Sequence, residues 1–99
     1  MEAQAIKILK HNIHHHGFSD VYSFAANQAK LLTLSKIEEY KNVITFFQKK
    51  YGMTFKQFEK RLKNSKAENF EHEDDLLEWR FASEAVSMYE KELIVLEKC

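Results

Sequence analysis

Two histidines near the start of the chain have a spacing that suits metal binding. His11 and His15 would lie four residues apart on one face of a helix, which gives zinc or nickel two nitrogen ligands. His14 and His16 lie close by, but no cysteine or carboxylate follows at a spacing that would complete the site. Two imidazoles do not make a metal centre, so we expect no metal and no cofactor.

A cluster of acids occupies the stretch before Trp79. Its members at helical spacing are Glu71, Asp74, Asp75 and Glu78. The pair His72-Glu73 begins like the helix of a zinc protease, but Leu76 stands where the second histidine is needed. One Glu-x-x-Asp motif resembles half of the magnesium site of helical nucleotide pyrophosphatases, and the second half is absent. We expect no catalytic residues, and therefore no enzyme.

Other functional classes are limited by composition. Cys99 is the sole cysteine, so no internal disulfide can form, and no Gly-x-Ser-x-Gly nucleophile motif is present. No apolar run approaches the roughly 20 residues of a membrane-spanning helix, and the first residues lack the apolar core of a signal peptide. We therefore expect a soluble protein in the cytoplasm, with no membrane partner.

Cations and aromatic residues alternate between Lys49 and Lys66. Lys56, Lys60 and Arg61 could neutralise phosphates while neighbouring rings stack on bases. The aromatic residues fall at helical spacing, which also suits a core, and no phosphate-binding glycine loop or helix-turn-helix pattern is present. Nucleic-acid binding through this basic elbow is the alternative function.

The formal net charge of zero conceals two oppositely charged halves. Through Lys66 the chain has twelve Lys or Arg and five Asp or Glu, and after it three and ten, so the halves carry +7 and −7. The two blocks can offset each other within one fold, or the acidic block can dock on a basic partner.

The elements that position these residues are helices. A chain of 99 residues with 44% hydrophobic content suits one domain, and 2 Gly with no Pro argue against a fold of many tight turns. Two apolar seams step by three and four residues, the signature of amphipathic helices. The first seam is Ile37, Tyr40, Ile44, Phe47 and Tyr51; the second is Trp79, Ala82, Val86, Tyr89, Leu93 and Leu96.

We predict an all-α fold, an antiparallel hairpin of two long helices. The helices should span about 20–51 and 70–98, with a short connecting helix at about 55–63 and Leu31 and Leu34 leading into the first seam. Residues 1–18 form a His-rich N-terminal extension with room for a short helix, and residues 19–99 form the hairpin domain. Gly52 suits the end of the first long helix, and Thr54 with Gln57 suits a capping box for the next.

A second stripe runs beside the seam of the last helix. Phe81, Met88 and Val95 are spaced by seven residues and therefore share one helical face. The first long helix likewise carries Leu32, Val43 and Phe46 beside its seam. A hairpin of two helices buries one face of each, so this surplus is left for the N-terminal extension, the elbow, a second copy or a different protein to cover. We expect a homo-oligomer or a complex with a partner protein that covers it.

The elbow and the acidic helix start resemble a family of small proteins. The residues are Lys50-Tyr51-Gly52-Met53 and Asp74-Asp75-x-x-Glu78-Trp79, and the resemblance covers about residues 20–98. Small bacterial and archaeal proteins with these two motifs are described as antitoxin-like and are often encoded beside a small toxin-like protein. The resemblance implies a non-enzymatic role, in which the chain binds and masks a partner protein such as a small toxin encoded nearby.

We therefore expect a protein-interaction module. Its predicted contact residues are the second stripe, Phe81, Met88 and Val95, and the acids Glu71, Asp74, Asp75 and Glu78.

Overall fold

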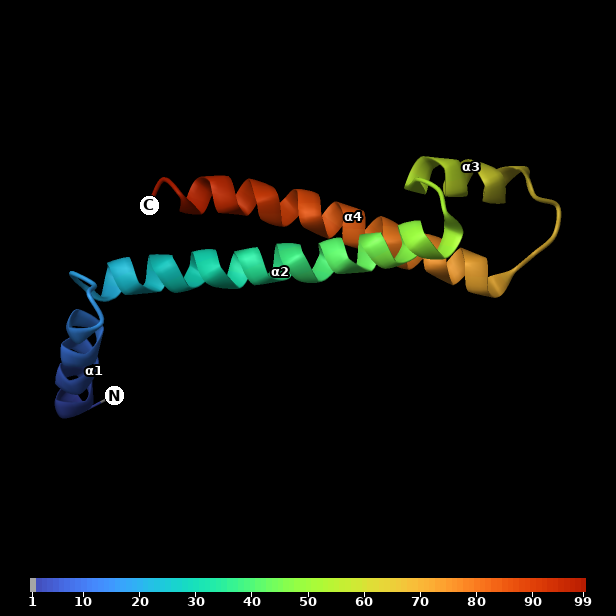
Figure 1. The fold of residues 1–99 in the computed structure, drawn as a ribbon. Coiled ribbons are helices and arrows are strands. Elements are labelled where there is room, and N and C mark those ends of the chain that lie inside the picture. Colours follow the sequence, from blue (N-terminus) through green and yellow to red (C-terminus); the bar gives the residue numbers. More distant parts are fainter. Residues whose placement is uncertain (1) are drawn as a thin grey trace.

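The computed structural model of the protein describes residues 2–99, which form four helices and no strand. Helix α1 spans Ala3–His15, α2 Val21–Tyr51, α3 Phe55–Asn64 and α4 Phe70–Leu96. Helices α2 and α4 lie side by side and antiparallel; α3 folds back near their connected ends, and α1 projects from the other end (Figure 1). The predicted all-α hairpin is confirmed.

The helix ends follow from local side-chain chemistry. Asp20 caps α2 by accepting a backbone N–H, and Gly52 ends it in the left-handed conformation, with φ of 62°. Thr54 and Gln57 form the predicted capping box at the start of α3. Asn69 caps α4 in the same way as Asp20 caps α2. Four short-range signals therefore divide the chain into its elements.

Three aromatic rings, one from each of α2, α3 and α4, form the core at the elbow. Phe47, Phe58 and Trp79 are 2% exposed or less. The Trp79 ring stacks on Phe47 at a centroid distance of 5.7 Å and on Phe58 at 5.6 Å. Partly buried side chains surround them: Val43, Ile44, Tyr51, Met53, Phe55, Leu62 and Leu76. This cluster holds α3 against the hairpin.

Both predicted seams lie in the interface of α2 and α4, with one correction. Leu31 and Leu34 do not lead into the seam, because they are 53% and 47% exposed. Thr33 takes that place at 8% exposure, and its hydroxyl donates a hydrogen bond to the Ala29 carbonyl within the helix. A buried hydroxyl that is satisfied by its own backbone can replace an apolar residue in a seam.

The molecule is long and thin. Its principal extents are 66 × 26 × 18 Å, and its radius of gyration is 20.7 Å, compared with about 13 Å for a compact chain of this length. Helix α1 adds to this length, because it leaves the start of α2 at a steep angle (Figure 1). Ile13, 2% exposed, anchors it there, and Gly17 at a φ of 92° makes the turn.

The aromatic core predicts the effect of removing one ring. Phe47→Ala should lower the free energy of unfolding by about 3–5 kcal/mol, because a cavity opens where three helices meet. Phe70→Ala removes the same ring from a side chain that is 73% exposed, so it should change stability by less than about 0.5 kcal/mol. Urea denaturation followed by circular dichroism measures both, and equal losses would contradict the assignment of the core.

Candidate functional site

The second stripe on α4 is exposed along its whole length. Phe81 is 60% exposed, Met88 49% and Val95 63%. Only Phe81 has an aromatic neighbour on α2, the edge of Tyr40 at a centroid distance of 5.7 Å. These three predicted contact residues are therefore on one face of α4, and the hairpin does not cover them.

Helix α2 contributes a matching row that was not among the predicted contact residues. Leu32 is 68% exposed and Phe46 60%. They are fourteen residues apart, two heptads, and therefore lie on the same side of α2. The heptad position between them is Glu39, an exposed residue that pairs with Lys36 at 3.2 Å. The sequence already places Leu32 and Phe46 beside the first seam, and the burial of Thr33 in place of Leu31 and Leu34 shows on which side of α2 they lie.

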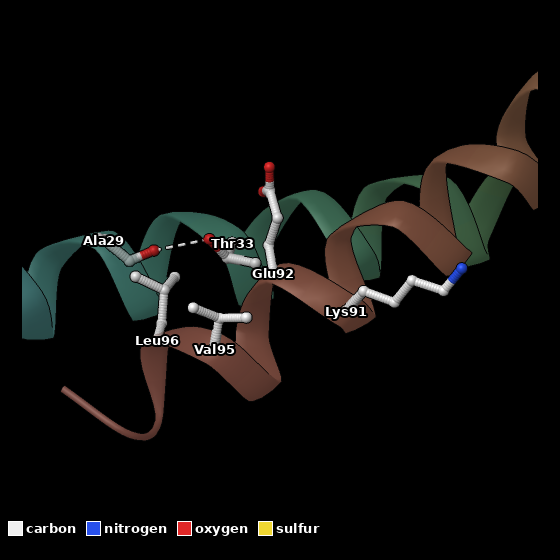
Figure 2. A pocket seen from close by; sticks show the side chains of 6 residues that line it. All are labelled: Ala29, Thr33, Lys91, Glu92, Val95 and Leu96. Atoms are coloured by element: carbon white, nitrogen blue, oxygen red, sulfur yellow. Dashed lines mark hydrogen bonds between the residues drawn. The ribbon is translucent and has the colours of Figure 1, made fainter.

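The two rows border the same side of the hairpin. A shallow groove of about 570 Å³ lies between α2 and α4, and Val95 and Leu96 point across it toward Ala29 and Thr33 (Figure 2). Its lining residues are Ala29, Thr33, Lys91, Glu92, Val95 and Leu96. Leu32 is one turn beyond Ala29 on the same side of α2. We call Leu32, Phe46, Phe81, Met88 and Val95 the apolar flank.

Two alanines lie between the two rows of the apolar flank. Ala85 is 6% exposed, because the Tyr40 ring packs between Phe81 and Tyr89, one turn to either side of it on α4. Ala29 lies beneath the groove farther along α2. The side chains between the two rows are therefore small, and the larger apolar side chains of the flank project into solvent on both sides of them.

Two of the four predicted acids are bound within the chain. The Lys50 ammonium donates to Asp75 at 2.7 Å and to Glu71 at 2.9 Å, and the Tyr51 hydroxyl also donates to Asp75. The sequence motif Lys50-Tyr51 thus meets the acidic start of α4. Asp75 and Glu71 act at least partly as internal partners of the basic elbow.

The environment of this cluster shifts the pKa values of its members. Burial raises the pKa of Tyr51 to about 12, helped by its hydrogen bond to Asp75. Burial also acts to raise the pKa of Asp75, but hydrogen bonds from Lys50 and Tyr51 outweigh it and hold that pKa below its ordinary value. The hydrogen bonds to Asp75 and Glu71 raise the pKa of Lys50. The cluster is therefore a charged clamp between α2 and α4.

The other two acids remain open to solvent. Asp74 and Glu78 are exposed and form no ion pair within residues 2–99. Asp74 precedes Phe81 by seven residues, so it extends the second stripe with a negative charge. The apolar row on α4 thus has an acidic end near the elbow.

The predicted nucleic-acid residues all lie on the outer face of α3. Lys56, Lys60 and Arg61 are exposed, whereas Phe58 points into the aromatic core. The one acid of α3, Glu59, pairs with Arg80 of α4 at 2.7 Å. The solvent face of α3 therefore presents these three cations and Lys63, and the one carboxylate of the helix is already paired with α4.

The candidate metal ligands lie far from these surfaces, on α1. His11 and His15 are exposed, and their rings stack with a centroid distance of 6.4 Å. In the part of the chain that the structure describes, no group of three or more His, Cys, Asp or Glu side chains could hold a metal ion. His72 is half-buried against the rings of Tyr51 and Phe58.

Comparisons add no relative from which a role could be transferred: no family model, curated protein or solved structure matches the chain. None of the four helices is both long and apolar enough to cross a membrane. The surfaces described above therefore carry the functional argument.

The charged clamp predicts how stability depends on pH. Tyr51 has a raised pKa, so its contribution is complete below its ordinary value of 10.0 and is lost as the pH rises toward about 12. Tyr51→Phe should cost about 1 kcal/mol at neutral pH and reduce the loss between those values. Asp75 has a lowered pKa, so its contribution is lost as the pH falls below its ordinary value of 3.8.

Denaturation across these pH ranges measures both effects. Tyr40→Phe is the matched control, because Tyr40 also packs in the seam but donates no side-chain hydrogen bond within residues 2–99. If Tyr51→Phe kept the alkaline profile of the unsubstituted protein, the clamp would not contribute to stability.

Proposed function

We propose that this chain is a non-enzymatic protein-interaction module that binds a partner protein through the apolar flank. The observation that carries the proposal is the exposure of five large apolar side chains, between 49% and 68%, on one side of a hairpin. Exposed apolar surface of this extent is characteristic of binding surfaces, because monomeric proteins rarely keep such patches without a function.

The total surface of the chain supports the same proposal. The accessible area is 7799 Å², whereas a compact protein of this mass exposes about 5,900 Å². Burying the exposed part of one large apolar side chain is worth about 1–2 kcal/mol. A partner that covered the apolar flank would therefore gain a substantial driving force from these five residues alone.

The acidic end of the second stripe suggests the chemistry of one partner. Asp74 and Glu78 have free carboxylates beside the apolar row, so a partner with a basic, partly apolar surface would be attracted and oriented there. The resemblance to antitoxin-like proteins fits this arrangement. The role we propose is to bind a partner protein and mask it, as an antitoxin masks a small toxin.

Nucleic-acid binding is the second candidate, and the outer face of α3 favours it. Lys56, Lys60 and Arg61 present three exposed cations on a short helix. Phosphate groups would be neutralised there, whereas the aromatic rings of the elbow are committed to the core and could not stack on bases. This candidate therefore predicts electrostatic binding with little sequence preference.

Two adjacent residues on α4 test the leading proposal. Val95 belongs to the apolar flank, and Ile94, 58% exposed, points about 100° away from it around the helix. Val95→Glu should reduce the protein retained by a tagged chain in its native cells at least tenfold, whereas Ile94→Glu should not. Mass spectrometry of the retained material, a second copy or another protein, provides the measurement.

Circular dichroism should show the same helicity and melting behaviour for both variants, because both residues are exposed. Retention of no protein, or equal retention by both variants, would refute the assignment of the apolar flank as a binding surface.

A salt titration tests the second candidate. A fluorescent single-stranded RNA should lose affinity roughly 20-fold between 50 and 200 mM salt if the three cations of α3 contact phosphates. Reversing Lys56, Lys60 and Arg61 to Glu should abolish this dependence. The control reverses three distant exposed cations, Lys7, Lys10 and Lys98; a similar effect of both variants would exclude a specific role for α3.

A further inference from the structure

We infer that the protein seated on the apolar flank is a second copy of this chain, so that α4 of each copy lies on α2 of the other. The inference rests on the proposed function, because it names the second copy as the occupant of the same flank, and a masked partner protein would compete with that copy for it. Four observations support it: the area available, the matched heights of the two rows, the charges of the two helices, and the open access to the flank.

The area is sufficient for a stable dimer. Two separate chains would expose twice the 7799 Å² of one, whereas a compact protein of the doubled mass exposes about 9,800 Å². The difference is about 5,800 Å², and a bundle that stays elongated and buries only half of it would still exceed the roughly 1,200–2,000 Å² of a standard specific interface.

The two rows of the apolar flank match in height along the hairpin. Phe47 of α2 stacks on Trp79 of α4. Phe46 directly precedes Phe47, and Phe81 follows Trp79 by two residues, so Phe46 and Phe81 lie at nearly the same position along the hairpin axis. Thr33 and Leu96 line one groove at the other end. Their neighbours Leu32 and Val95 therefore also share a level.

A two-fold axis parallel to the helices would bring residues at matching heights into contact. It keeps every residue at its own height and exchanges the two rows, so α4 of one copy meets α2 of the other. Phe81 would then pack on Phe46 of the second copy, and Val95 on Leu32. An axis across the helices would instead place Met88 against Met88.

The charges favour the first arrangement. Helix α4 has eight carboxylates and two cations, whereas α2 has five lysines and two glutamates. Placing α4 on α2 therefore brings opposite charges together, whereas α4 on α4 brings like charges together. Each dimer would be a four-helix bundle in which neighbouring helices are antiparallel.

Neither α3 nor α1 covers the apolar flank, and the polar residues that a second copy would meet there include the exposed pair Lys36–Glu39. Helix α3 meets α4 through Arg80, which pairs with Glu59 and lies over Phe55. Arg80 is about 100° around the helix from Phe81, and Phe81 remains 60% exposed beside α3. Helix α1 leaves from the opposite end of the hairpin (Figure 1).

Sedimentation of the full chain at micromolar concentrations is the first test. The unsubstituted protein should have twice the 11.8 kDa mass of one chain. Leu32→Lys and Val95→Glu should each be monomeric, whereas Leu31→Lys and Ile94→Glu, on the adjacent residues, should remain dimers. Mixing the Leu32→Lys and Val95→Glu proteins should restore a dimer, because the two new charges are opposite and face each other.

Disulfide trapping tests the register in a Cys99→Ser background. Phe46→Cys and Phe81→Cys proteins should not cross-link alone but should give a covalent dimer when they are mixed and oxidised. A dimer trapped by Met88→Cys alone would overturn the proposed axis.

The failure of this inference is distinguishable from that of the proposed function. If the chain sediments as a monomer at all concentrations, and Val95→Glu still releases a different retained protein, the second copy is overturned and the interaction module stands. If the chain is a monomer and Val95→Glu releases no protein, both are overturned.

Discussion

The stack of Phe47, Phe58 and Trp79 is the contact on which the rest of the structure depends. Each ring comes from a different helix, and α3, with ten residues, is too short to be stable in isolation. The stack therefore fixes α3 and sets the register of α2 against α4 at the same time. The clamp of Lys50, Tyr51 and Asp75 lies one helical turn away and supports the same register. This register determines which residues of α2 and α4 lie at the same position along the hairpin axis, including those of the two rows of the apolar flank.

A single layer of two helices leaves each helix with more than one free face. The two flanks of the hairpin differ in the kind of residues that they expose. On one flank, α3 covers the elbow and Lys41 approaches Glu90 at 3.9 Å, so the surface suits water. On the other flank, Leu32, Phe46 and the second stripe of α4 stand beside a groove, and the charges there are the Lys36–Glu39 pair and the groove residues Lys91 and Glu92. The clustering of five large apolar side chains on this flank supports the proposed binding face, because exposed apolar residues occur singly on most proteins.

The predictability of this fold depended on the range of the interactions involved. Gly52, Thr54 and Gln57 act on the backbone within four residues, so the sequence identified the elbow correctly. Thr33 could not be recognised as a seam residue, because its polarity argued against burial and only its bond to the Ala29 carbonyl makes burial acceptable. Lys50 and Asp75 are 25 residues apart in the sequence and lie on different helices. Their contact depends on the register of α2 against α4, and no local sequence pattern encodes that register.

The division of charge along the chain has two physical roles that the structure separates. Part of it is neutralised internally, where Lys50 meets Glu71 and Asp75 across the hairpin. The remainder stays exposed near the elbow, as cations on α3 and as Asp74 and Glu78 on α4. Like charges on each helix disfavour the pairing of identical helices, whereas the acidic α4 and the basic α2 attract each other. The same segregation that joins the arms of one hairpin would therefore favour, in the proposed dimer, the contact of α4 with α2 of the second copy.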